Sequence, residues 1–99
     1  MLTVYTNPLF YRHDTGIGHP ETASRIDAAV SGVERAGLAS CVRSDAPEHP
    51  DTGRIIARVH AAGHERELEE ACRAGQRLFH SVDNPISPGS FAAARAAVG

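Results

Sequence analysis

His13-Asp14-Thr15-Gly16-Ile17-Gly18-His19-Pro20-Glu21, followed closely by Arg25, is the stretch that decides the fold. It comes after an apolar opening, Leu2-Thr3-Val4-Tyr5-Thr6, which is rich in β-branched and aromatic residues and is typical of a short strand. A helix-like pattern follows it. Loops between a first strand and a first helix often hold the functional groups of α/β proteins. The sequence therefore predicts an α/β fold with a functional loop at residues 7–19.

The segment after this loop predicts one amphipathic helix. Pro20 suits a first helical position, and Glu21 places negative charge near the positive end of the helix dipole. Apolar residues then recur every three or four positions, and Gly37 is placed to terminate the helix. The apolar face consists of Ile26, Ala29, Val30, Val33 and Ala36. We expect a helix from Pro20 to Ala36.

The rest of the chain predicts short elements of both kinds. The first of these are a strand or extended segment at 38–43, a loop at 44–53 and a helical turn around Ile55, Ile56 and Val59. A helix follows between Gly63 and Gly75, and then an apolar pair at Leu78-Phe79. The last are a loop at 83–89 and a helix over Ser90–Ala97, which is capped by Ser87 and has Pro88 at its first position. The helix before Gly75 carries four glutamates that we expect to lie mostly in water. Such alternation favours an α/β fold with a parallel sheet.

Composition limits what the chain can bury and bind. Its 99 residues match the size of one domain, but the apolar fraction of 41% relies on alanine, with three Phe, two Tyr and no Trp. Large side chains contribute most of the burial free energy, at about 25 cal/mol per Å². This supply is thin for a free-standing core. The net charge of −2, without a basic face, excludes the nucleic-acid-binding class.

Cysteine use and hydropathy predict a cytoplasmic protein. Cys41 and Cys72 form no C-x-x-C pattern and fit reduced, buried thiols. No apolar run reaches the length of a membrane span, and the first residues have no secretory signal pattern.

The histidines of the loop also allow a metal-site interpretation, which their spacing disfavours. His13 and His19 are six residues apart with Asp14 between them, and this matches no familiar zinc pattern. A capping or loop-bracing role is the favoured interpretation, and a small metal enzyme built on these three residues stays an alternative. His60 is expected to be a partly buried structural imidazole at a helix end.

Four segments together resemble the N-terminal part of the histone deacetylase superfamily, above all its bacterial histone-deacetylase-like amidohydrolases, acetoin-utilization proteins and acetylpolyamine amidohydrolases. They are the opening strand with the loop from His13 to Arg25, the helix ending at Gly37-Leu38, Val59-His60 before an acidic helix, and Asp83-Asn84-Pro85-Ile86-Ser87-Pro88-Gly89-Ser90-Phe91 with the alanine-rich helix to Gly99. Their order matches the family and covers essentially the whole chain. Departures lie at Ala23, near His64 and at Asn84, where members usually have proline, an aromatic residue and threonine.

The resemblance implies the fold and the activity. The implied fold is the N-terminal portion of an arginase/deacetylase-type three-layer α/β fold with a parallel sheet, so residues 1–99 would be a C-terminally truncated segment of a histone-deacetylase-like domain. The implied activity is zinc-dependent removal of an acyl group from acetyl-lysine or an acetylpolyamine. The family's zinc ligands, catalytic histidine pair and oxyanion-stabilising tyrosine all lie beyond the position matching Gly99. No catalytic residue or metal ligand is therefore assigned here, and the fragment itself is expected to be inactive.

The resemblance also implies roles for four residues of this chain. Asp83 matches a rim aspartate that accepts hydrogen bonds from substrate backbone, work that suits an ionised carboxylate. His19 and Pro20 match a rim loop that shapes the acyl channel, so all three are candidate substrate-binding residues. Arg25 matches an arginine of the internal channel beneath the metal, where a fixed cation would steer the acetate product. The plain alternatives are a turn role for Asp83 and a surface ion pair for Arg25.

A second function class stays open. The chain would then be a stand-alone, non-catalytic binding or regulatory module derived from the same fold. In both cases the expected partner is an acetylated small amine or acetyl-lysine, with no nucleic acid and no membrane, and the sequence leaves the oligomeric state open.

Overall fold

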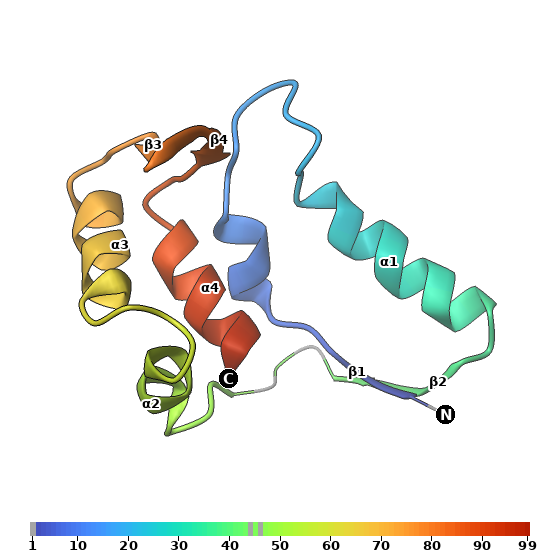
Figure 1. The fold of residues 1–99 in the computed structure, drawn as a ribbon. Coiled ribbons are helices and arrows are strands. Elements are labelled where there is room, and N and C mark those ends of the chain that lie inside the picture. The colour runs from blue at the N-terminus through green and yellow to red at the C-terminus, as the bar shows by residue number, and fades with distance from the viewer. Residues whose placement is uncertain (1, 44, 46) are drawn as a thin grey trace.

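The computed structural model describes residues 2–43, 45 and 47–99 and shows a mixed α/β chain of open shape (Figure 1). Its elements are β1 (Leu2–Tyr5), the 3-10 helix η1 (Pro8–Arg12), α1 (Ser24–Arg35), β2 (Ala39–Arg43), α2 (Thr52–Ala57), α3 (His64–Arg73), β3 (Leu78–Phe79), β4 (Ser81–Pro85) and α4 (Ser90–Val98). The predicted alternation of strands and helices is confirmed. Within the described chain, no helix is both long and apolar enough to cross a membrane.

β1, α1 and β2 form a strand–helix–strand unit, which we call the arm; in the sequence, η1 lies between β1 and α1. β1 and β2 pair in parallel, with Val4 opposite Val42 and Tyr5 opposite Arg43. Parallel neighbours require a crossover connection, and α1 supplies it. The expected strand at 38–43 and the parallel pairing are therefore confirmed, in a sheet of two strands over the described residues.

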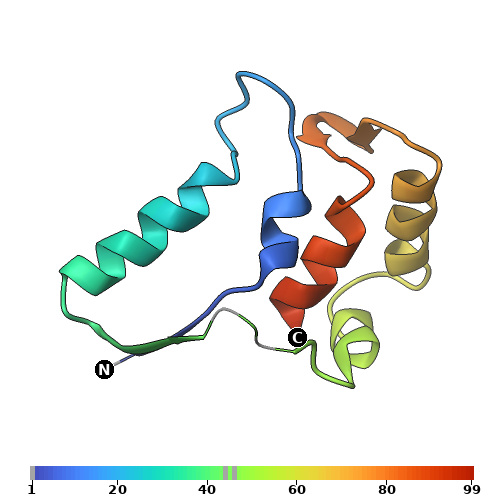
Figure 2. The ribbon, with the colours of Figure 1, turned by 180° about the vertical axis from the view of Figure 1, so that it is seen from behind.

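The remaining elements form what we call the body: η1, α2, α3, the β3–β4 hairpin and α4. Figures 1 and 2 show α4 between α3 and η1, and α4 packs on η1, α2 and α3. Among the residues whose burial the structure describes, the buried ones all belong to the body. They are Ala71, Cys72, Phe79 and Ala93, with the polar Thr52 and Ser90. The prediction of a buried thiol is thus confirmed for Cys72.

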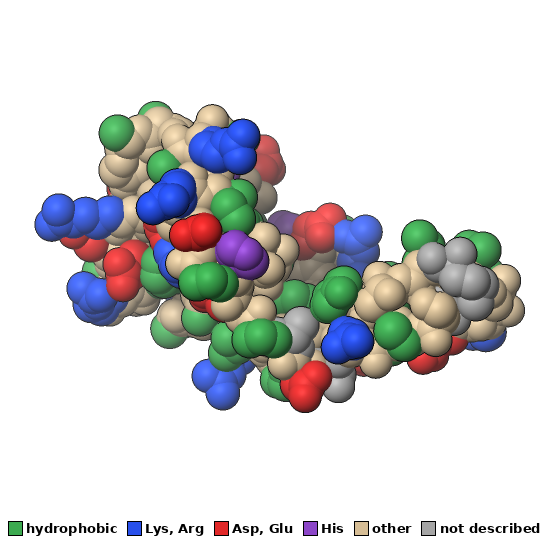
Figure 3. Space-filling view, turned by 90° about the horizontal axis from the view of Figure 1, so that it is seen from below, with side chains coloured by type: hydrophobic (Ala, Val, Ile, Leu, Met, Phe, Trp, Pro, Cys, Tyr) green, Lys and Arg blue, Asp and Glu red, His purple; other side chains and the backbone are tan. Residues whose placement is uncertain are grey.

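The arm has no comparable interior. No residue of α1 is buried, and α1 takes part in none of the substantial packing contacts between the described elements. In β1, Leu2 is 55% exposed and Tyr5 is 62% exposed. Figure 3 shows hydrophobic side chains open along the lower surface of the molecule.

The open shape is measurable in the whole chain. Its accessible surface is 6977 Å², whereas a compact monomer of this mass exposes about 5,400 Å². The radius of gyration is 14.7 Å, against about 13 Å for a compact chain of this length. The accessible surface in excess of the compact value is comparable to the area that a protein–protein interface buries.

The first helix begins later than predicted. Pro20 is not its first residue, because α1 starts at Ser24 and Pro20 lies in a bend. The Thr15 hydroxyl donates to the Glu21 carbonyl, which removes that carbonyl from the helical ladder, and the Arg25 amide bonds Thr22 instead. The loop therefore extends to the start of α1.

Three further expectations were wrong. Cys41 is exposed, because nothing among the described residues covers the two-stranded sheet that carries it. His60 is also exposed, since its ring stacks on the His64 ring at 4.6 Å between centroids and does not enter the core. The expected loop at 83–89 is partly a strand, because β4 includes Asp83 and pairs antiparallel with β3. A two-stranded hairpin tolerates such polar residues at an open edge.

Candidate functional site

Two segments that are far apart in the sequence meet at the start of α4. His13 Nδ1 lies 2.7 Å from the Ser90 hydroxyl oxygen. The Ser87 hydroxyl donates to the Arg12 carbonyl at 3.1 Å and accepts the Asp14 amide at 3.0 Å. The Ser87 amide donates to Ser90 Oγ at 2.7 Å. These bonds join the first and last motif segments into one junction.

The local sequence explains why the junction forms there. Ser87 and Ser90 bond reciprocally, since the Ser90 amide also donates to the Ser87 carbonyl at 3.0 Å. This resembles a capping box, although the residue directly before the helix is Gly89, so the predicted cap and first position at Ser87 and Pro88 are displaced. A Cβ on Gly89 would lie 2.5 Å from the Arg12 carbonyl oxygen, and glycine is therefore required for this close approach. Sequence reasoning missed Ser90, although the S-x-x-S spacing is a usable signal.

The glycines of the loop fix its turn. Gly16 and Gly18 have positive φ angles of 86° and 82°, which favour glycine strongly. Ile17 between them is fully exposed at the tip of the loop. Below the tip, Asp14 Oδ1 accepts the Gly16 amide at 2.9 Å. The loop is thus held by its own polar groups.

The two loop histidines act as braces. His13 holds the loop to α4. His19 Nδ1 accepts the Glu21 amide at 3.0 Å, within the bend that precedes α1. The predicted bracing role is confirmed for both. Pro20, the third predicted loop residue, is exposed beside them.

Arg25 forms a surface ion pair and also borders a pocket. Its guanidinium pairs with the Glu21 carboxylate, and 60% of its side chain is exposed. It lines a pocket of about 340 Å³ between α1 and η1, together with Phe10, His13 and Ile26. The ion pair matches the alternative expectation that Arg25 is a surface arginine. The pocket is the surface at which Arg25 would act if it lined an internal channel.

Asp83 lies apart from these residues. It is exposed on β4, and its amide donates to Ser81 Oγ at 3.1 Å. A groove of about 610 Å³ separates the glycine loop from the hairpin, and its walls come from residues 14–17, 75–78 and 85–88. The structure therefore brings the loop and the hairpin to one groove, but Asp83 is not among the residues that line it.

One hydrogen bond links η1 to α1. The Tyr11 hydroxyl donates to Asp27 Oδ1 at 2.6 Å. This bond is the largest cause that raises the pKa of Tyr11 above its usual value of 10.0, followed by burial and by the negative charge of Asp27. The arm and the body are thus joined by an exposed polar contact.

The described residues do not form a metal site. Over positions 2–43, 45 and 47–99, no three or more His, Cys, Asp or Glu side chains converge where an ion would bind. His13 and His19 each use a ring nitrogen in a hydrogen bond within the chain.

Comparison with family models, with curated proteins and with solved structures found no match to this chain. The family resemblance accordingly rests on the four sequence segments.

Proposed function

We propose that this chain forms the first part of a zinc-dependent amide hydrolase of the histone deacetylase type, which acts on acetyl-lysine or an acetylpolyamine. The zinc ligands and the catalytic histidine pair would come from sequence that follows position 99. In this proposal the chain contributes one wall of the active site and no catalytic group.

The observation that carries the proposal is the junction at the start of α4. His13 and Asp14 from the first motif segment contact Ser87 and Ser90 from the last one, 73 and 77 positions away. If both segments belong to one wall of an active site they must lie side by side, and this contact supports that arrangement.

The openness of the arm supports the larger domain. Parallel sheets are almost always covered on both faces. β1 and β2 form a parallel pair with exposed side chains, and the chain exposes far more surface than a compact monomer. Further strands and helices would cover this surface in the proposed three-layer arginase/deacetylase-type fold.

The proposal gives each candidate residue a physical task. Asp83 is exposed and free of a covering element, so its carboxylate can accept hydrogen bonds from a substrate amide. Arg25 sits on the wall of the pocket between α1 and η1, where its charge would attract acetate. His19 and Pro20 would set the backbone of the rim, since His19 braces the bend before α1.

The first experiment determines the messenger sequence beyond codon 99. The proposal predicts an open reading frame that encodes an adjacent histidine pair after a glycine, and an Asp-x-His further on. A stop codon directly after codon 99 would contradict it and favour the stand-alone binding module. The purified 99-residue chain should show no acetyl-lysine hydrolysis above a metal blank.

The second experiment tests Asp83 in the longer protein. Asp83→Asn should lower kcat/KM for an acetyl-lysine peptide by about tenfold or more, mainly through KM, because a charged hydrogen bond to the substrate is lost. Asp51→Asn is the matched control, since Asp51 is also exposed and its side chain does not cap α2. Equal activity of the two variants would remove Asp83 from the substrate site.

A further inference from the structure

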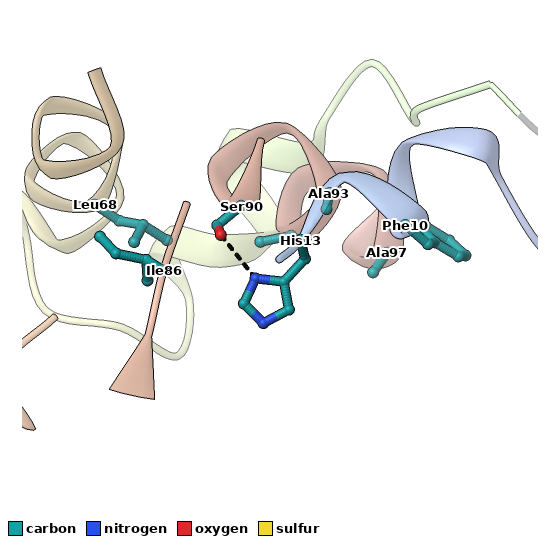
Figure 4. A pocket seen from close by; sticks show the side chains of 8 residues that line it. Phe10, His13, Leu68, Ile86, Ser90, Ala93 and Ala97 are labelled. Carbon is teal, nitrogen blue, oxygen red and sulfur yellow. Dashed lines mark hydrogen bonds between the residues drawn. The ribbon is translucent and has the colours of Figure 1, made fainter. Parts of the chain in front are cut away.

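We draw no further inference here: the strongest candidate, the open pocket beside α4 with almost entirely apolar walls that His13 and Ser90 border (Figure 4), carries none, because nothing among the described residues shows what covers it.

Discussion

The arm and the body differ in how their elements are held. In the body, side chains from three helices and a hairpin bury Ala71, Cys72, Phe79 and Ala93. In the arm, β1 and β2 share backbone hydrogen bonds, but α1 buries no residue. Similar apolar patterns along the sequence therefore have different outcomes, because a helix face is stabilised only when another surface covers it.

This difference separates a region with an interior from a region without cover among the described residues. The body has a small interior of its own, whereas the arm is joined to it by the chain and by the exposed Tyr11–Asp27 hydrogen bond. Parallel sheets occur almost only with both faces covered. Our account is that the arm becomes ordered when the rest of an α/β domain packs on it.

The largest effect on the free energy of unfolding should come from a glycine-to-alanine substitution in the body, compared with the same substitution in the arm. Gly89→Ala places a Cβ within 2.5 Å of the Arg12 carbonyl oxygen, and we expect it to cost about 2–3 kcal/mol of unfolding free energy because backbone must shift. Gly32→Ala on α1 meets nothing within 4 Å and should stabilise the helix by up to about 1 kcal/mol. Urea unfolding followed by circular dichroism measures both. If both substitutions changed the free energy of unfolding in the same direction, the contrast between the arm and the body would be contradicted.

A charge deletion compares a packed ion pair with an open one. Arg95 bonds Glu48 at 2.6 and 3.0 Å and also pairs with Glu65, and its side chain is 25% exposed. Arg95→Met should cost about 1–2 kcal/mol, because two neighbouring carboxylates lose their shared cation.

The control for this deletion is the exposed pair of Arg66 and Glu70 on α3. Arg66→Met should cost less than about 0.5 kcal/mol. A loss at Arg66 as large as that at Arg95 would mean that Arg95 does not hold α4 to its neighbours.

The junction at α4 should respond to removal of one hydroxyl. Ser90→Ala leaves His13 Nδ1 and the Ser87 amide without their partner and should cost about 1–2 kcal/mol. Ser31→Ala, at an exposed position of α1, should change stability by no more than about 0.5 kcal/mol. ¹⁵N shifts of the His13 ring in the serine variant would report the lost contact, and an unchanged ring spectrum would contradict it.

The smallest effect concerns the contact between the two regions. The hydrogen bond to Asp27 raises the pKa of Tyr11 in the folded chain, so its stabilisation is present below pH 10 and is lost as pH rises through the folded pKa. Asp27→Asn should lower the pKa of Tyr11, measured from the ring carbon shift in NMR and assigned with Tyr11→Phe. An unchanged titration would show that this bond does not form in solution.

Much of the element order could be predicted from sequence. The strand at 2–5, the helix that ends before Gly37 and the alanine-rich last helix have strong local signals, and each lies close to its expected place. The start of α1 was missed because the Thr15 hydroxyl competes for the Glu21 carbonyl, a contact between residues of one loop that periodicity does not reveal.

Less of the candidate site could be predicted. His13 was expected to brace the loop, but its partner Ser90 is 77 positions away and no local pattern connects the two. Cys41 was expected to be a buried thiol because it forms no C-x-x-C pattern, and His60 was expected to be partly buried because it lies at a helix end; His60 instead stacks on His64. Burial depends on what covers an element, and in the arm the described residues supply no such cover.

Amide hydrogen exchange of the unaltered 99-residue chain tests the central claim most directly, because each region has helical amides of its own. We predict that amides in α4, around Ala93 to Ala97, exchange at least about tenfold more slowly than those in α1, around Val30 to Arg35, after correction for intrinsic rates. Protection in α1 and in β1–β2 equal to that in α4 would contradict the account, because the arm would then be stable without further cover.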